Sequence, residues 1–480
     1  MTELSQTILG PILIPRADGT VDFLPDGALR CDANGTIDFV GNRSDLPPPL
    51  DFGELSRAAS SRNSAGIILP PFLDAHIHIP QNPIRGHFMD NVPAHPPEGR
   101  LIAGLNRNVF PAEARCADPS IARRVVADFA DDTLSQGVVG GAAYMTVHPA
   151  ATDIALSQLH EFWSVGLVLM EMNCPEYLRT DRMKVNDELS RDLAHRFGRR
   201  FIMTDRFAVT VGSDLRQWAA RMASELGLRM QTHLNEQVRE KELVEKKLYP
   251  QYGSYTDVYY RDGLLDHDAI LAHCIHMSDA EFALVARSES FIAHCPTSNT
   301  LLCSGIMPLD KVHEHGIEYA ICTDVGASPT PSILAEIAQF LQVHAGRSDR
   351  ATPSEALYRA TRAPAKILGL SEQLGSLEIG KPMSFIEVTC AGTYRSADDA
   401  IRYGLLDLYG PRDEVEDDLA YDREHRAALG DLAHLRLDVG PRMSFLERDI
   451  RMIAERLEKK VISVTLAGRE IWRRDAAKVV

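Results

Sequence analysis

The sequence predicts an α/β protein made of a (β/α)8 TIM-like barrel and a small flanking β-sandwich domain built from both termini. Between residue 67 and about residue 370, short apolar runs alternate with longer amphipathic stretches, which is the rhythm of repeated β/α units. Eight such units can be counted, and eight parallel units close naturally into a barrel. Short apolar runs separated by turn signals occupy the two ends of the 480-residue chain, as expected for a second, smaller sheet.

The eight expected barrel strands are short apolar segments, each followed by an amphipathic stretch. In barrels of this type the loops that follow the strands gather at one face, so residues at the strand ends meet there. The expected strands cover residues 67–76, 138–146, 166–173, 201–209, 228–234, 269–276, 290–295 and 318–324.

The flanking domain is expected from residues 1–66 and 375–480, and the barrel from residues 67–374. In the C-terminal part, SFIEV at 384–388 and VISVTLAGREIW at 461–472 are expected to be strands that pair with the N-terminal hairpins. The N-terminal part contains the turn signals of small hairpins, which are Asp18-Gly19, Asp26-Gly27 and Asn34-Gly35.

The C-terminal part also contains a charged helical insertion within residues 391–460. Its apolar residues recur at helical spacing, which predicts an amphipathic helix on the surface or at a subunit contact. The sequence assigns no function to this segment. The residues that define the helix are Leu446, Ile450, Ile453 and Leu457.

The composition excludes several classes of protein. A net charge of −16 would repel nucleic acid polymers and anionic membrane surfaces, so a small neutral substrate is expected instead. The first residues lack a basic segment before an apolar stretch, and no apolar run approaches the length of a membrane span. Eight cysteines without a CxxC pair predict reduced thiols and a cytoplasmic protein.

His76 and His78 stand two residues apart at the end of the first expected barrel strand, in LPPFLDAHIHIPQ. Because side chains alternate along a strand, both imidazoles point to the same side. Neutral imidazole is a good zinc ligand, so two histidines that project into a barrel indicate a metal site. Taken alone, the HxH pattern is also compatible with two unrelated polar side chains.

Three further strand ends carry residues of the same kind. The fifth ends in LRMQTHLNEQ, with His233 at the barrel mouth and Glu236 three residues later, where a carboxylate beside a metal-bound water could carry a proton. The sixth ends in AILAHCIHM, with His273 and His276. The eighth ends in YAICTDVGAS, where Asp324 follows a buried run and requires a nearby cation. Each residue alone has a structural explanation, but their joint placement does not.

The strand ends predict a single metal ion per chain. The fourth expected strand ends in Asp205-Arg206-Phe207 and not in a lysine, so a carbamate-bridged pair of metals is disfavoured. Zinc is the expected ion, and Fe²⁺ is the alternative. The expected ligands are His76, His78, His233 and Asp324.

The sequence resembles the amidohydrolase superfamily, and within it the guanine deaminase branch. The resemblance runs through nearly the whole barrel and implies a metal-dependent hydrolase barrel that converts guanine to xanthine and ammonia. It also implies a homodimer with a role in purine catabolism. The stretches that carry it are LPPFLDAHIHIPQ, FPAEARCAD, TVHP, DRF, QTHLNEQVREKELVEKKLYPQYGSYTDVY, LAHCIHMSD, IAHCPTSNTLLCSG and CTDVGAS.

The resemblance assigns roles to individual residues. It implies that Glu236 and His273, together with the ligand Asp324, act on the attacking water and the substrate. An amide and a guanidinium can hydrogen-bond a purine while an aromatic ring stacks on its face. Arg206 could instead be one half of a structural salt bridge. The positions that match the purine site are Gln81, Arg206 and Phe207.

Some stretches depart from the family pattern, so the substrate is not fixed by the resemblance. The chain has HLNEQ where the family has HLSEN, Gly326-Ala327-Ser328 where it has a glycine-rich turn, and no aromatic, leucine-rich lid between residues 81 and 110. The substrate could be another amino-heterocycle, such as a pterin, an 8-oxopurine or a triazine. The chain could also be a hydrolase that opens a cyclic amide with two metals, or an inactive barrel that serves as a binding module.

Overall fold

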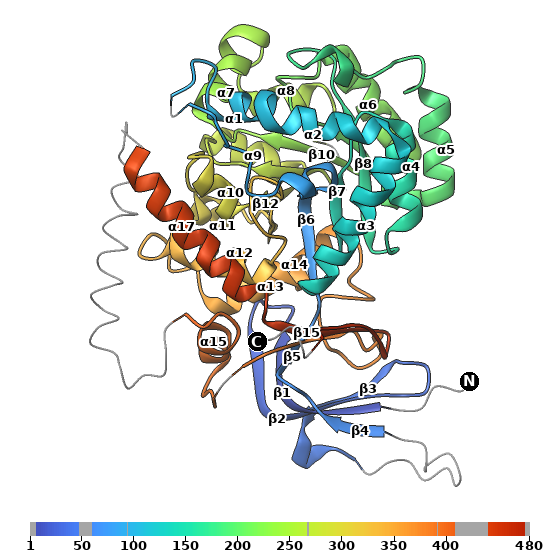
Figure 1. Cartoon of the computed structure of the whole chain (residues 1–480), viewed down its shortest axis with the longest axis vertical. Helices are drawn as coiled ribbons and strands as arrows, with labels where there is room; N and C mark the ends of the chain where they lie inside the picture. The colour runs from blue at the N-terminus through green and yellow to red at the C-terminus, as the bar shows by residue number, and fades with distance from the viewer. Residues whose placement is uncertain are drawn as a thin grey trace.

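The computed structural model describes residues 6–47, 60–93, 95–265, 268–390, 392–408 and 440–475, with only the backbone of 440–446. Two β structures lie at opposite ends of the molecule, the barrel above and the sheet of the two termini below (Figure 1). The expected fold class is confirmed.

The barrel consists of eight parallel strands that are hydrogen-bonded in chain order. Its first strand begins later than expected, because residues 67–76 divide into β5 (Ile67–Leu69), which belongs to the other sheet, and β6. Pro70 and Pro71 separate the two, since proline has no N–H for a ladder hydrogen bond. The barrel strands are β6 (Phe72–His78), β7 (Val138–Tyr144), β8 (Trp163–Leu169), β9 (Phe201–Asp205), β10 (Met230–Leu234), β11 (Ile270–His273), β12 (Phe291–His294) and β13 (Tyr319–Ile321).

The barrel closes where the chain leaving β13 meets β6. The Asp324 N–H donates to the His76 carbonyl at 2.9 Å, and the His78 N–H donates to the Val325 carbonyl at 2.9 Å. Below them, the Thr323 hydroxyl donates to the buried Asp74 carboxylate at 2.5 Å. The hydrogen bonds that close the barrel therefore also bring the ends of its first and last strands side by side.

Helices surround the barrel and bury one face each against the strands. The outer helices are α3 (Pro119–Ser135), α4 (Pro149–Gln158), α5 (Asp187–Phe197), α6 (Ser213–Leu226), α8 (Tyr255–Arg261), α9 (Asp279–Arg287), α11 (Leu309–Glu314), α12 (Ile333–His344), α13 (Pro353–Ala360) and α14 (Arg362–Leu368). Shorter helices lie in loops that follow strands: α1 (Arg100–Gly104), α2 (Phe110–Ala114), α7 (Val238–Leu243) and α10 (Pro296–Leu301).

The second sheet joins strands from both ends of the chain, in the order β16-β15-β14-β5-β1-β2-β3, with β4 beside β1. Asp18-Gly19 and Asn34-Gly35 lie in the turns of its first two hairpins, as predicted. The prediction for Asp26-Gly27 is wrong: this pair lies inside β2, at a register shift where Gly27 faces Gly10. The strands are β1 (Gln6–Pro15), β2 (Val21–Cys31), β3 (Ile37–Asn42), β4 (Ser60–Asn63), β5, β14 (Phe385–Val388), β15 (Val461–Leu466) and β16 (Arg469–Arg473).

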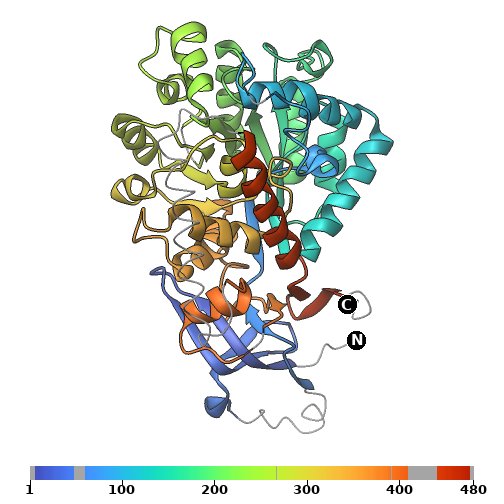
Figure 2. The same cartoon turned by 60° about the vertical axis from the view of Figure 1, so that its left-hand side comes forward.

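The amphipathic helix expected in the charged insertion is present as α17 (Gly440–Leu457). It crosses the outside of the barrel against α10 and α12, with Ile450 and Leu457 buried (Figure 2). Before it come α15 (Ala397–Asp399) and residues 409–439, which lie outside the described part of the chain. No helix in the described ranges has the length and apolar character needed to cross a membrane. None of the eight cysteines forms a disulfide.

Candidate active site

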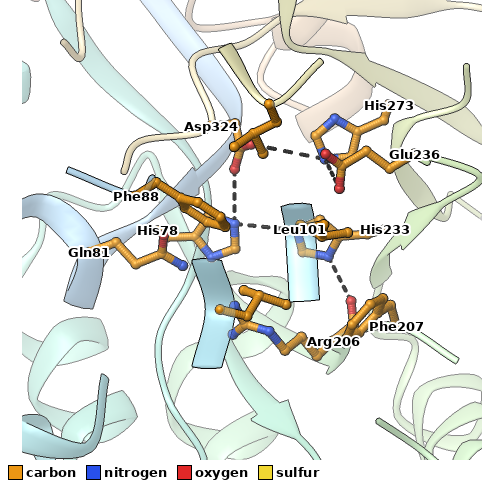
Figure 3. Close-up of a pocket in the computed structure, with 12 residues that line it drawn as sticks. His78, Gln81, Phe88, Leu101, Arg206, Phe207, His233, Glu236, His273 and Asp324 are labelled. Atoms are coloured by element: carbon orange, nitrogen blue, oxygen red, sulfur yellow. Dashed lines mark hydrogen bonds and ion pairs between the residues drawn. The ribbon is translucent and has the colours of Figure 1, made fainter. Parts of the chain in front are cut away.

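A pocket that is partly open to solvent lies at the carboxyl ends of the barrel strands (Figure 3). Every site residue predicted from the sequence lines it except His76, whose ring centre lies 5.1 Å from that of His78. His276, the other histidine after β11, is not in the lining because its Nε2 bonds the Ser304 carbonyl at 2.7 Å. The walls are apolar and consist of Phe88, Leu101, Leu105 and Leu302.

Four of these residues converge on one point. His76 and His78 end β6, His233 lies near the end of β10, and Asp324 follows β13. One potential ligand atom from each lies within 4.8 Å of all the others. The side-chain alternation along β6 accounts for the two histidines, and the closing hydrogen bonds of the barrel account for Asp324 beside them.

The nitrogen atoms of this cluster are arranged as a metal ion requires. His233 Nδ1 lies 2.6 Å from the Arg206 carbonyl, which can only accept, so the proton is on Nδ1 and Nε2 has a lone pair. That Nε2 faces His78 Nε2 at 3.4 Å. His76 Nε2 is buried without a hydrogen bond, although it lies 3.3 Å from Asp324 Oδ1. Lone pairs that face one another in a buried space fit a shared cation.

The protonation states agree with this geometry. Burial lowers the pKa of His76 to about 4 and also lowers the pKa of His78 and of His233, so the three imidazoles are neutral at pH 7. Burial alone would raise the pKa of Asp324, but His76 and His78 beside it hold that pKa well below its usual range. Three neutral imidazoles and one carboxylate anion form a donor set that can bind a divalent metal ion.

Glu236, which follows β10, and His273, at the end of β11, face this cluster. Glu236 Oε1 accepts from the Ser304 hydroxyl at 2.8 Å, and Oε2 lies 3.7 Å from His273 Nε2. His273 Nδ1 lies 2.8 Å from Asn299 Oδ1, which directs Nε2 into the pocket. Burial raises the pKa of Glu236, whereas the carboxylates of Glu236 and Asp324 raise the pKa of His273 against the effect of burial. A buried carboxyl group and an imidazole in contact can exchange a proton.

The opposite side of the pocket carries hydrogen-bond donors fixed by a buried carboxylate. Arg206 Nη1 donates to both oxygens of Glu113, at 2.7 and 2.9 Å, and Gln81 Nε2 donates to the same carboxylate at 3.0 Å. The Arg206 guanidinium lies 5.2 Å from the centre of the Phe110 ring. Arg206 therefore does form a buried salt bridge, and its other nitrogens form no hydrogen bond with the described residues. Phe207 is 3% exposed and borders the same space.

Sequence reasoning did not assign roles to several polar residues of this region. Glu113 holds Arg206 and Gln81 from α2. The other three follow β12: Ser298 donates to Asp324 Oδ2 at 2.6 Å, Asn299 bonds His273, and Ser304 bonds Glu236. All four stand in stretches that carry the family resemblance, FPAEARCAD and IAHCPTSNTLLCSG. The resemblance could therefore have pointed to these residues, but it could not show which side chains they contact.

The fold and the site together define a class, that of barrel enzymes with a metal-binding centre of histidine and aspartate at the carboxyl ends of the strands. Within it the chain belongs to the amidohydrolase family, whose model matches residues 67–403. The protein is therefore a hydrolase.

Several known proteins of similar sequence are guanine deaminases, while the solved structures of similar fold also include an adenosine deaminase and triazine hydrolases. The guanine deaminase of Escherichia coli (strain K12) is 32% identical over 328 residues, which are 67% of this chain and 72% of that protein. The guanine deaminase of Dictyostelium discoideum is 29% identical over 388 residues, 76% of this chain and 84% of that one. A solved structure of E. coli guanine deaminase has the same fold, with a TM-score of 0.74 and 24% identity over 98% of this chain and 100% of that chain.

Proposed function

We propose that this protein deaminates guanine hydrolytically, producing xanthine and ammonia, with one zinc ion per chain. The observation that carries the proposal is a single pocket that places a buried metal-binding cluster beside Glu236 and opposite the fixed donors of Arg206 and Gln81. The relatives named guanine deaminase support it, and so does a solved structure of the same fold described as guanine deaminase from C. acetobutylicum with bound guanine.

The proposed substrate matches the chemistry of the pocket. Guanine is a flat, neutral ring with a carbonyl oxygen and ring nitrogens that accept hydrogen bonds. The free N–H groups of Arg206 and the amide of Gln81 would bind these acceptors, while Phe207 and the apolar walls would hold the ring faces. Substrate recognition in such sites depends on a few polar groups among apolar ones.

His76, His78, His233 and Asp324 would hold the zinc ion. When bound, zinc would lower the pKa of a water molecule toward neutrality. The protein residues would then move the protons: Glu236 takes one from the water as its oxygen attacks the amino-bearing carbon, and delivers it to the neighbouring ring nitrogen. His273 holds the attacking oxygen in line through Nε2.

A second proton transfer completes the balance. Asp324 accepts the remaining proton of the attacking oxygen and passes it to Glu236, which delivers it to the amino group, so that ammonia leaves as the C–N bond breaks and the carbonyl forms. Ser298 and Ser304 keep the two carboxylates directed at the reacting atoms. General acid–base catalysis of this kind contributes on the order of 10²–10⁴-fold in rate.

Ammonia release measured in parallel with guanine, a pterin, an 8-oxopurine and a triazine tests the proposal. We expect guanine to have the highest kcat/KM. A higher value for another ring would keep the chemistry and reassign the substrate. No release from any ring, together with purified protein that binds no metal, would support an inactive barrel. Two metals per chain would favour a hydrolase that opens a cyclic amide.

The remaining expectations follow from the same proposal. A homodimer is proposed by likeness to the family and is tested by light scattering on the purified protein. A cytoplasmic location and a role in purine catabolism are proposed from the unpaired cysteines and the guanine substrate. Growth of the source organism on guanine as sole nitrogen source, with and without the gene, tests the catabolic role.

A further inference from the structure

A second cavity, of about 500 Å³, lies at the opposite mouth of the barrel, where the strands begin. The residues before β9, β10 and β11 line it together with the C-terminal end of α14, the helix near the sheet of the termini (Figure 1). Four basic side chains reach it against two acidic ones. In a protein with a net charge of −16, such a local excess of positive charge requires an explanation.

Arg229, directly before β10, is the centre of this excess. Arg229 is only 4% exposed, and its Nε is buried without a hydrogen-bond partner, while the rest of the guanidinium borders the cavity and forms no hydrogen bond or ion pair with a described residue. Burial lowers its pKa to about 10, so it is still charged at pH 7. A buried polar atom without a hydrogen-bond partner costs free energy, so the unpaired Nε of Arg229 calls for an explanation.

The neighbouring charges do not neutralise Arg229. Arg200 is committed to backbone carbonyls, with Nε on Trp163 at 3.0 Å. Lys366 is paired with Glu318 at 2.8 Å. Asp268 is paired with Arg199 at 2.5 Å. Of the three guanidinium groups in the lining, those of Arg199 and Arg229 are not committed to backbone carbonyls, and the two carboxylates beside them belong to Asp268, which is bound to Arg199, and to Glu161.

Gly369 ends α14 beside Arg229 in the left-handed conformation that favours glycine, so no side chain enters the cavity from this position. Phe162 and Leu370 add apolar surface to the rest of the lining. The volume is within the range of sites for small molecules, about 300–1,000 Å³.

We propose that this cavity is a binding site for a phosphate group, held chiefly by Arg229 and Arg199. A phosphate offers three acceptor oxygens and up to two negative charges, so it could bind both guanidinium groups at once. A single carboxylate is already present in Asp268 and leaves Arg229 unpaired. The group would arrive as inorganic phosphate or as the phosphate of a small organic molecule, and the site is separate from the pocket that holds Asp324.

The test is a titration of the full-length protein with sodium phosphate, with a nucleoside monophosphate and with the corresponding nucleoside, against sodium chloride at equal ionic strength. Isothermal calorimetry and the shift in Tm are the measurements. We expect phosphate to raise Tm and bind, and tighter binding of the monophosphate would identify an organic phosphate as the ligand. Equal affinity would identify the phosphate group alone. The nucleoside should not show this binding.

Two variants decide whether the proposed residues are responsible. Arg229→Gln should weaken phosphate binding by at least about tenfold, and Arg199→Gln, at a position more than half exposed, should weaken it without a risk to folding. Arg124→Gln, an exposed arginine on α3, is the matched control and should bind as the parent does. Phosphate that stabilises no more than chloride, or binds both cavity variants normally, overturns the proposal.

Discussion

Two buried arginine–carboxylate pairs, Arg206–Glu113 and Arg216–Asp262, lie in different regions and serve the molecule differently. In the second, Arg216 Nε donates to Asp262 at 2.8 Å and Nη1 donates to the Val211 carbonyl and to Tyr249. Nη2 lies 2.8 Å from Asp262 Oδ2 in the ion pair but forms no hydrogen bond with a described residue. Arg216 is thus surrounded by partners from its own protein, between α6 and the residues around α8.

In the first pair only one nitrogen of the arginine is committed. Arg206 Nη1 meets Glu113, while the rest of the guanidinium borders the pocket. Burial and ion pairing are therefore common to both pairs. They differ in that the remaining N–H groups of Arg206 border the pocket, whereas Arg216 is enclosed by its own protein. Unused donors that face a pocket indicate a ligand, whereas a pair enclosed by its own protein indicates a role in stability.

Removal of the metal should have the largest effect on activity, and this effect should not involve the Arg216–Asp262 pair. Treatment with a chelator, or Asp324→Asn, should lower kcat/KM on the order of 10⁴-fold, because several kcal/mol of transition-state stabilisation are lost. Metal content per chain and ammonia release are the measurements. Added zinc should restore the chelated parent but not the variant; full activity in metal-free protein would contradict the proposed site.

Glu236→Gln should lower kcat by about 10²–10⁴-fold, because the amide can neither accept nor deliver the proton. The Ser304 hydroxyl can still bond the amide, so folding and metal content should match the parent. Metal analysis together with steady-state kinetics distinguishes this outcome from loss of the ion. Turnover near the parent value would refute the role of Glu236 as proton carrier.

Glu113→Gln sharpens the comparison of the two pairs. The variant weakens the charge-assisted bond that orients Arg206, so we expect KM for guanine to rise about 10- to 100-fold, with a smaller change in kcat. Asp262→Asn is the matched control, because it weakens the equivalent bond to Arg216. It should lower the free energy of unfolding and leave KM unchanged. Equal effects of both variants on KM would contradict the proposal that only the Arg206–Glu113 pair acts in substrate binding.

Arg216→Met should have the smallest effect on catalysis and a large one on stability. It leaves the Asp262 carboxylate buried without its cation, which should lower the free energy of unfolding by about 3–5 kcal/mol. Urea unfolding measures the loss, and kinetics at low temperature should give the parent kcat and KM for the folded enzyme. A changed KM at full folding would show that this region also acts on the pocket.

The comparison also explains what the sequence could predict. The alternation along β6 and the apolar runs that end in His233 and Asp324 are local patterns, so the strands and the residues at their ends could be predicted with the barrel. The side chains that contact those residues could not be predicted. Glu113 meets Arg206 across 93 positions of sequence, and only the folded chain shows which carboxylate is paired.

Local reasoning failed where a contact from elsewhere decided the conformation. Asp26-Gly27 has the composition of a tight turn, yet it lies inside β2 because the partner strand β1 runs past it with a register shift at Gly10. Likewise, an apolar run continues from Ile67 to His76, but the two prolines within it transfer its first part to the other sheet. Pairing with a distant strand overrides propensity in both cases.

The closure of the barrel has a consequence for cooperativity. The Asp324 N–H bonds the His76 carbonyl, so two segments separated by 248 positions share one hydrogen bond directly at the metal cluster. An ion bound there would link the first and last strands of the barrel. Its binding free energy would offset part of the conformational entropy lost when these distant segments are brought together. Amide hydrogen exchange at the seam between β6 and β13 should therefore slow when zinc binds.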